Sequence, residues 1–183
     1  MKKIIVMMGG QGVGKGTFSK MLATQFGYTH IEAGAMLRAL PSDSPVAQII
    51  ARGELVPDDM LFGLVADRLK NTDAILDGFP RTLYQAQWLV DNYADKYDIH
   101  VIYLEISEEL MLKRINNRIN EGGGRADDTD AAAVRRRLDT FWNVTMPAIE
   151  WLRDTAKGIK FTTVQPQDTT VDENFAKVLV ALN

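Results

Sequence analysis

The stretch GGQGVGKGT at Gly9–Thr17 lies between a short apolar run, Ile4–Met8, and an amphipathic stretch, Lys15–Phe26. This order predicts a strand, a glycine-rich loop and a helix, in which successive backbone N–H groups turn inward around an anion at the positive end of the helix. Lys15 supplies a point charge, and Thr17 supplies a hydroxyl that suits a magnesium ion. A glycine-rich turn that merely joins strand to helix is the alternative, and the Lys-Gly-Thr ending disfavours it. We therefore interpret the stretch as a P-loop that binds a nucleotide polyphosphate.

Short apolar runs and longer amphipathic stretches alternate along the chain. The apolar runs are rich in Ile, Val and Leu, which is typical of strands buried on both faces of a parallel sheet. They are Ile4–Met8, Ala74–Leu76, His100–Ile106 and Ile159–Val164, and we expect a further short strand near Tyr28–Ile31. The amphipathic stretches, with helical spacing, are Lys15–Phe26, Asp58–Lys70, Leu83–Tyr93, Glu108–Asn120, Ala131–Thr155 and Asp172–Leu182. The alternation predicts a three-layer α/β fold with helices on both faces of a central parallel sheet.

Two stretches interrupt this alternation. Residues from about 32 to 60 are predicted to form several short helices, because prolines and a glycine divide the stretch. These breaks fall at Pro41, Pro45, Gly53 and Pro57. Residues from about 119 to 130 are glycine-rich and then acidic, without an apolar face. We expect a single domain over 1–183 in which both stretches project from the carboxyl edge of the sheet, where ligands bind in open α/β folds.

The composition limits the class of protein. The chain has 183 residues, of which 46% are hydrophobic, and this is enough for a core. Its net charge of −3 and its pI near 5.4 disfavour a general nucleic-acid or membrane-surface binder. Without cysteine it forms neither a disulfide nor a thiolate metal site. No apolar run approaches the roughly 20 residues that span a bilayer, and we expect a soluble, cytoplasmic protein.

A second motif, LDGFPRT at Leu76–Thr82, closes an apolar run and precedes a helix. A carboxylate at the carboxyl end of a strand can hold Mg²⁺ through its water shell, which is the role we expect of Asp77. The Gly-Phe-Pro turn fixes a backbone carbonyl and directs Arg81 towards a second phosphate. A strand-ending turn with a surface arginine is the alternative, which the preceding P-loop disfavours.

Together these segments resemble the adenylate kinase family over nearly the whole chain. Gly9–Thr17 looks like its ATP loop, and Asp77–Gln85 looks like its Asp-Gly-Phe-Pro-Arg signature with the following glutamine. The weaker matches are in five places. Tyr28–Arg38 and Gly53–Asp58 are similar to the family's two monophosphate-binding segments. Arg114 and Arg118 resemble its arginine pair on the helix entering the lid, and Arg125–Asp128 and Arg135–Arg137 resemble the lid exit and the helix after it. The resemblance implies reversible transfer of a phosphoryl group from Mg·ATP to AMP by a monomer, giving two ADP for nucleotide homeostasis.

The arginines fit such a reaction without reference to the family. Two nucleotides that meet head to head bring about five phosphates into one cleft, and this charge must be neutralised before transfer. Planar guanidinium groups suit this better than lysine; the candidates are Arg38, Arg81, Arg114, Arg118, Arg125 and Arg137. Three consecutive side chains cannot all enter one cleft, so we expect Arg135 or Arg136 on a solvated helix face. An ionised AMP phosphate needs no general base, and we interpret His30 and His100 as structural.

Gly122–Gly124 gives the backbone unusual freedom just before Arg125. We expect a short lid here that closes over ATP and excludes water, with an inert flexible loop as the alternative. Asp127 and Asp128 could pair with arginines in the closed lid, or one of them could cap the next helix. The family has long lids, some with zinc, and short ones. About ten residues without cysteine resemble the short form, and no zinc is expected.

Two positions give opposite indications about the acceptor base. The family usually has Ser-Thr-Gly-Asp where this chain has Glu32-Ala33-Gly34-Ala35, whereas UMP/CMP kinases carry Ser-Ala-Gly. Gln85, however, follows Arg81 at the adenylate kinase spacing, and its amide suits the adenine edge. We favour AMP, with a UMP/CMP kinase as the alternative and a non-catalytic P-loop nucleotide-binding module as the less favoured one. The segment Gln165–Gln167 lacks the family's glycine, so we assign no site residue there.

Carried over position by position, the resemblance implies three sets of residues. Those expected to act in catalysis are Lys15, Arg81, Arg114, Arg125 and Arg137. The expected ATP site consists of Gly12, Val13, Gly14, Lys15, Gly16, Thr17, Arg114 and Arg118. The expected AMP site consists of Ala33, Gly34, Arg38, Glu54, Leu55, Val56, Gly78, Phe79, Pro80, Arg81, Gln85, Arg125 and Arg137. Magnesium, the cofactor with ATP, is expected at Thr17 and, through water, at Asp77.

Overall fold

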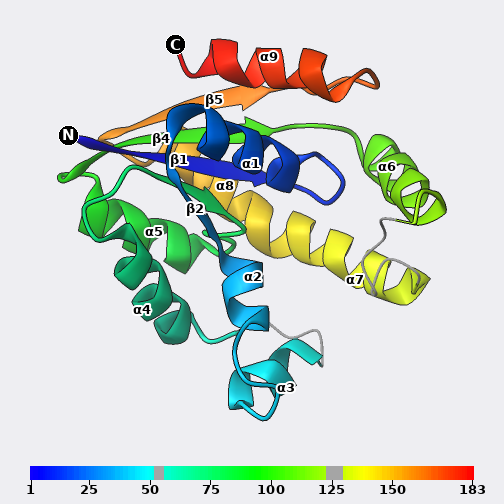
Figure 1. The fold of residues 1–183 in the computed structure, drawn as a ribbon, viewed down its shortest axis with the longest axis horizontal. Helices are drawn as coiled ribbons and strands as arrows, with labels where there is room; N and C mark the ends of the chain where they lie inside the picture. The colour runs from blue at the N-terminus through cyan, green and yellow to red at the C-terminus, as the bar shows by residue number, and fades with distance from the viewer. Residues whose placement is uncertain (52–55, 123–129) are drawn as a thin grey trace.

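Five parallel strands form the central sheet of the computed structural model, which describes residues 1–51, 56–122 and 130–183. The strands are β1 (Lys2–Gly9), β2 (Thr29–Glu32), β3 (Ala74–Asp77), β4 (Tyr97–Leu104) and β5 (Ile159–Val164). Their order in the sheet is β2-β3-β1-β4-β5 (Figure 1). The central strands β3 and β1 are buried except at the first two residues of β1, because layers cover both faces of the sheet.

Helices cover both faces of this sheet (Figure 1). They are α1 (Lys15–Phe26), α2 (Ala33–Arg38), α3 (Pro45–Ala51), α4 (Asp58–Leu69), α5 (Leu83–Tyr93), α6 (Glu108–Asn120), α7 (Ala131–Thr140), α8 (Met146–Asp154) and α9 (Val171–Ala181). On one face, Phe18 of α1 stacks on Phe175 of α9 with ring centroids 6.2 Å apart. On the other face α5 packs against α8, and Phe62 of α4 stacks on Trp88 of α5 at 4.3 Å. The predicted α/β fold with a central parallel sheet is confirmed.

Local sequence sets several helix ends. The hydroxyl of Thr82 accepts a hydrogen bond from the N–H of Gln85 at the start of α5, and Ser107 caps α6 in the same way. Helix α1 ends at Gly27, whose φ of +68° lies in the left-handed region. The helices predicted at Lys15–Phe26, Leu83–Tyr93 and Glu108–Asn120 are confirmed with these bounds.

Two predicted elements were wrong in their extent by more than two residues or in their continuity. Strand β4 spans Tyr97–Leu104 rather than His100–Ile106, because its ladder with β1 ends where β1 leaves the sheet at Gly9. The single helix predicted over Ala131–Thr155 is divided into α7, a π-helical turn at Phe141–Thr145 (η2) and α8. Pro147 has no N–H to donate, so a regular α-helical hydrogen-bond ladder cannot continue through it.

Helices α2 and α3 extend away from the sheet beyond the end of β2 (Figure 1). Pro45 is the first residue of α3, and Pro57 immediately precedes α4, so these two prolines divide the segment as predicted. Gly53 lies outside the described residues, as do Arg125 and its neighbours from 123 to 129. That the two segments are functional inserts stays a prediction. Across the described ranges, none of the helices combines the length and apolarity that a membrane span requires.

Candidate active site

The carboxyl ends of β1, β2 and β3 meet at one edge of the sheet, because the strands are parallel. Met7 of β1 and Glu32 of β2 are both in register with Asp77 of β3. The glycine loop leaves β1 at this edge, α2 follows β2, and the Gly-Phe-Pro-Arg turn follows β3. Two motifs that lie about 60 residues apart in sequence are therefore neighbours at the place where open α/β sheets bind ligands.

The glycine loop between β1 and α1 has the backbone of an anion-binding turn. Gly12 and Gly14 have φ values of +70° and +100°, in the left-handed region that glycine adopts without strain. The ammonium group of Lys15 folds back over the loop and donates to the carbonyl oxygens of Gly9 and Gly10, each at 2.6 Å. The charge of Lys15 is thus held beside the loop's backbone, where a polyphosphate would lie.

The loop is packed tightly against β4 and α6. A Cβ atom added to Gly9 would lie 2.6 Å from the carbonyl oxygen of Leu104, and one added to Gly10 would lie 2.6 Å from the sulfur of Met111. Within the described part of the chain, both polar atoms of the Gln11 amide are buried without a hydrogen-bond partner. A buried polar group without a partner is costly, and this one fits a loop that receives a polar ligand.

Asp77 is buried at the end of β3 and faces the first turn of α1. A Cβ atom added to Gly16 would lie 3.5 Å from Asp77 Oδ2, and Thr17, the next residue, is exposed. Among the residues that the structure describes, no three His, Cys, Asp or Glu side chains gather into a metal cage. A carboxylate and a hydroxyl beside a phosphate loop fit Mg²⁺, which keeps several of its waters and prefers oxygen ligands.

His30 is a neighbour of Asp77 that the sequence did not reveal. Its Nε2 lies 3.6 Å from Asp77 Oδ2, and its side chain is only 18% exposed. The contact arises because β2 pairs in parallel with β3. Glu32 of β2 lies opposite Asp77 in this pairing, and His30 is two residues before Glu32 on the same strand. No local pattern encodes that pairing.

The turn after β3 orients Arg81 and Gln85. The Nε of Arg81 donates to the carbonyl oxygen of Gly78 at 3.1 Å, which directs the guanidinium along the turn. Gln85 is 2% exposed, and its amide is bonded at both ends. Its Oε1 accepts from the backbone N–H of Arg81 at 2.7 Å, and its Nε2 donates to Asp58 Oδ1 of α4 at 2.6 Å. Asp58 was not a predicted site residue.

Arg38 is the last residue of α2, and its side chain reaches back to a carboxylate partner at the start of the helix. Its Nη2 is 3.1 Å from Glu32 Oε1, and a Cβ atom added to Gly34 would lie 2.9 Å from its Nη1. The guanidinium therefore covers the predicted Gly34 segment. Ala33 beside it is buried and has no polar side-chain atom to offer a ligand.

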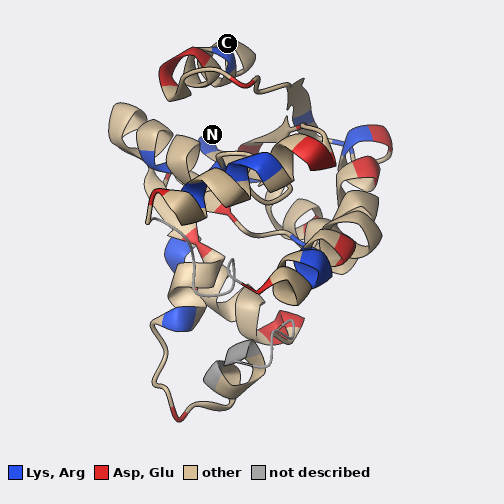
Figure 2. Ribbon diagram, turned by 90° about the vertical axis from the view of Figure 1, so that its right-hand side faces the viewer, with Lys and Arg blue, Asp and Glu red and all other residues tan. Residues whose placement is uncertain are grey.

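Helix α6 presents two of the predicted arginines. The helix begins with Glu108 and Glu109 and then carries Arg114 and Arg118. In Figure 2 the helix in front has acidic residues in red at one end and basic residues in blue along its length. Arg114 donates from Nη1 to the carbonyl oxygen of Val13 in the loop at 3.4 Å and from Nη2 to that of Gln167 at 2.5 Å. Burial lowers the pKa of Arg114, and nearby Asp168 opposes that shift. Arg118, in the last turn, is half-buried.

Arg135, Arg136 and Arg137 of α7 lie in different environments. Arg135 is exposed and pairs with Glu108 and Asp139, and Arg136 is exposed and lies 3.6 Å from Asp130. Arg137 is half-buried. We expected Arg135 or Arg136 on a solvated face, and both are exposed.

The remaining predicted residues divide into two groups. Phe79, Pro80 and Val56 are buried, and the Phe79 ring meets Phe62 and Trp88 edge to face. Glu54, Leu55 and Arg125 lie outside the described residues. Their roles stay predictions.

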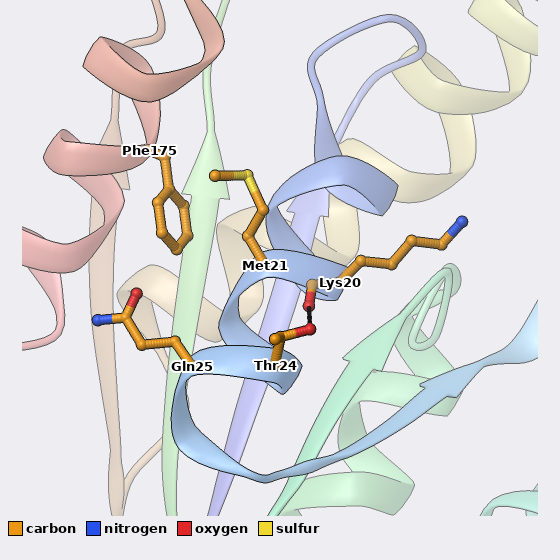
Figure 3. Close-up of a pocket in the computed structure, with 5 residues that line it drawn as sticks. All are labelled: Lys20, Met21, Thr24, Gln25 and Phe175. Carbon is orange, nitrogen blue, oxygen red and sulfur yellow. Dashed lines mark hydrogen bonds between the residues drawn. The ribbon is translucent and has the colours of Figure 1, made fainter.

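A cavity of about 420 Å³ opens between α1 and α9, away from the edge described above. Its lining residues are Lys20, Met21, Thr24, Gln25 and Phe175. Figure 3 shows Phe175 beside Met21, with Lys20 pointing away from them and the Thr24 hydroxyl donating to the Lys20 carbonyl oxygen at 3.0 Å. None of these residues belongs to the predicted site.

Comparison with known proteins supplies the family. The family model described as adenylate kinase matches residues 7–157. An adenylate kinase of Parvibaculum lavamentivorans is 41% identical over 167 residues, which cover 84% of this chain and 80% of that protein. An adenylate kinase of Mycobacterium tuberculosis is 35% identical over 97% of this chain and 98% of its own length. An adenylate kinase of Chlamydia caviae is 32% identical over 95% of this chain and 94% of its own length. The chain therefore belongs to the adenylate kinase family.

Proposed function

We propose that this chain transfers the γ-phosphoryl group of ATP reversibly to AMP and forms two molecules of ADP. The observation that carries the proposal is the proximity of the two motifs. The Asp77 carboxylate lies beside Gly16 of the loop, and the turn that starts at Gly78 directs Arg81 from the same strand end. Donor phosphates on the loop and an acceptor phosphate at Arg81 would then meet at one sheet edge.

On the donor side, the loop backbone and Lys15 would hold the ATP phosphates. Lys15 now donates to the carbonyl oxygens of Gly9 and Gly10, so its charge is already placed beside the loop. Arg114, bonded to the Val13 carbonyl, and Arg118, one helical turn further, would neutralise the charge that moves during transfer. Positioning and charge neutralisation are the main contributions to phosphoryl transfer.

Thr17 and Asp77 would hold the magnesium ion, Asp77 through water. A magnesium ion held there would neutralise part of the charge on the phosphates. Asp77 has the burial and the fixed position that such a role requires, since its strand is buried along its whole length. Thr17, at the third position of α1, is exposed and open to ligands.

On the acceptor side, Arg38 and Arg81 would bind the AMP phosphate and Gln85 the adenine. Arg81 and Gln85 lie on one turn joined by the 2.7 Å bond between the Arg81 N–H and Gln85 Oε1. Arg125 and Arg137 would complete the charge neutralisation when a short lid closes and excludes water. We further propose that the enzyme is a cytoplasmic monomer.

A coupled assay with Mg·ATP and AMP, UMP or CMP tests the proposal. ADP should form from AMP with a kcat/KM at least roughly tenfold above that for UMP or CMP, since the pyrimidines lack the purine contacts. A higher kcat/KM for UMP or CMP would identify the related pyrimidine kinase. No ADP with any monophosphate would identify a non-catalytic nucleotide-binding module. Light scattering should give the mass of one 20.4 kDa chain.

A further inference from the structure

The amide of Gln85 has only one orientation in this structure. A glutamine amide can turn over by exchanging its oxygen and nitrogen, and its partners decide which orientation is favoured. Here Oε1 faces a backbone N–H, which only donates, and Nε2 faces the Asp58 carboxylate, which only accepts when ionised. Turning the amide over would place an NH₂ group against the Arg81 N–H and an oxygen against the carboxylate.

Each amide atom keeps one further hydrogen-bonding position. The NH₂ group has two hydrogens and gives one to Asp58, and the oxygen has two lone pairs and uses one for Arg81. Nε2 can therefore still donate one hydrogen bond to a ligand and Oε1 can still accept one, and the order of these two atoms along the amide is fixed. Thr82 adds to this rigidity, because its hydroxyl accepts from the backbone N–H of Gln85 at 3.1 Å.

A fixed order of donor and acceptor distinguishes two kinds of purine edge. The edge of a 6-aminopurine presents an exocyclic NH₂ donor beside a ring nitrogen acceptor, which matches Oε1 followed by Nε2. A 6-oxopurine of the same shape presents a carbonyl oxygen beside a ring N–H, which places acceptor against acceptor and donor against donor. An amide free to turn over would serve both edges equally.

We propose that Asp58 is a positioning residue that sets the acceptor preference for a 6-aminopurine monophosphate by fixing the Gln85 amide. The proposal rests on the proposed function, in which Gln85 binds the acceptor base. Asp58 is well placed for this, because it is the first residue of α4, where the positive end of the helix stabilises a carboxylate. The contact joins α4 to the start of α5 across 27 positions of sequence.

Asp58→Asn and Asp58→Ala test the proposal, with Asp59→Asn as the matched control. The Asp58→Asn change keeps the size of the side chain but gives it a donor as well, so only the Arg81 N–H would oppose turning. Asp59 lies in the same first turn and is exposed, so Asp59→Asn removes the same charge from the same helix end. Each protein is assayed with Mg·ATP and AMP, and with inosine monophosphate both as a substrate and as a competitive inhibitor against AMP.

The wild type and Asp59→Asn should bind AMP much more tightly than inosine monophosphate. In both Asp58 variants this preference should fall by roughly tenfold or more, which is the usual effect of losing one hydrogen bond to a charged group. The KM for AMP should rise and the inhibition constant for inosine monophosphate should fall or stay constant, with kcat changed less than KM.

Two outcomes overturn the proposal. One is an Asp58→Asn protein with a native melting curve and a preference within about threefold of the wild type. The other is a wild type that accepts both monophosphates equally. If Asp58→Ala does not fold, the isosteric Asp58→Asn decides alone. Failure of the proposed function gives a different result, because the wild type would then form no ADP from ATP and AMP.

Discussion

Glu32 Oε1 lies 3.1 Å from Arg38 Nη2, so a carboxylate at the end of β2 occupies the guanidinium that we expect to bind the acceptor phosphate. Glu32→Gln should remove this competition and lower the KM for AMP. The Arg38 side chain is 55% exposed, and exposed ion pairs contribute about 0 to 1 kcal/mol, so the KM should fall by up to about fivefold. Steady-state kinetics at fixed Mg·ATP measures the change, and kcat should stay nearly constant.

Asp154→Asn is the control for Glu32→Gln. It breaks a comparable surface pair, with Arg153 at 2.8 Å, on a helix that contains no predicted site residue. The KM for AMP should not move in this control. An unchanged or higher KM in Glu32→Gln would mean that Glu32 does not compete with the acceptor.

Lys15→Met should reduce kcat by a thousandfold or more, roughly the scale reached when a group that stabilises transition-state charge is removed. The fold should be little affected, because the ammonium group bonds to loop carbonyls, those of Gly9 and Gly10, rather than to the core. Rapid-quench kinetics and thermal melting check the two parts. Lys20→Met, which removes the same charge from an exposed position of the same helix, should keep wild-type kcat.

Phe62→Ala should lower the free energy of unfolding by about 3 kcal/mol, the usual cost of removing a buried aromatic ring. Phe62 is 8% exposed and stacks on Trp88 at 4.3 Å, so it joins α4 to α5. Urea unfolding measures the loss. Tyr84→Ala removes another ring that touches Phe62, but Tyr84 is 58% exposed, and the loss should be below about 1 kcal/mol. Equal losses in the two variants would contradict the packing described.

His100 should make the fold less stable in mild acid. Burial lowers the pKa of His100 below its ordinary 6.5, and Lys160 acts in the same direction. Between the lowered pKa and pH 6.5 the unfolded chain binds more protons than the folded chain. The contribution of His100 to the free energy of unfolding is therefore fully present above pH 6.5 and is lost as the pH falls below it. His100→Gln should therefore lose less stability than the wild type between about pH 7.5 and pH 5.5. An equal decline in urea unfolding would exclude this contribution.

The sequence predicted what depends on near neighbours. The bounds of α1, α5 and α6 follow from caps such as Thr82 and Ser107 and from the spacing of apolar residues. The motifs at Gly9–Thr17 and Leu76–Thr82 were likewise recognisable, because each is a short local pattern. The π-helical turn before Pro147 was missed, although the proline itself signals an interruption of the helix.

Contacts between distant segments were not predictable in this way. The bond between Asp58 and Gln85 depends on how α4 packs beside α5, and the approach of His30 to Asp77 depends on β2 pairing with β3. Neither arrangement follows from a periodicity or a cap. A sequence pattern therefore names the groups that could contact a ligand, and tertiary packing decides which partners orient them.

Gly9 and Gly10, the first two residues of the loop, differ in the substitutions that they can tolerate. A side chain at Gly9 would meet a backbone oxygen, that of Leu104, and no replacement elsewhere can remove a backbone atom. A side chain at Gly10 would meet first the flexible end of Met111. Position 9 should thus be fixed as glycine in every functional descendant of this sequence, whereas position 10 should admit alanine wherever a shorter residue replaces Met111. The loop and α6 would then diverge as a coupled pair.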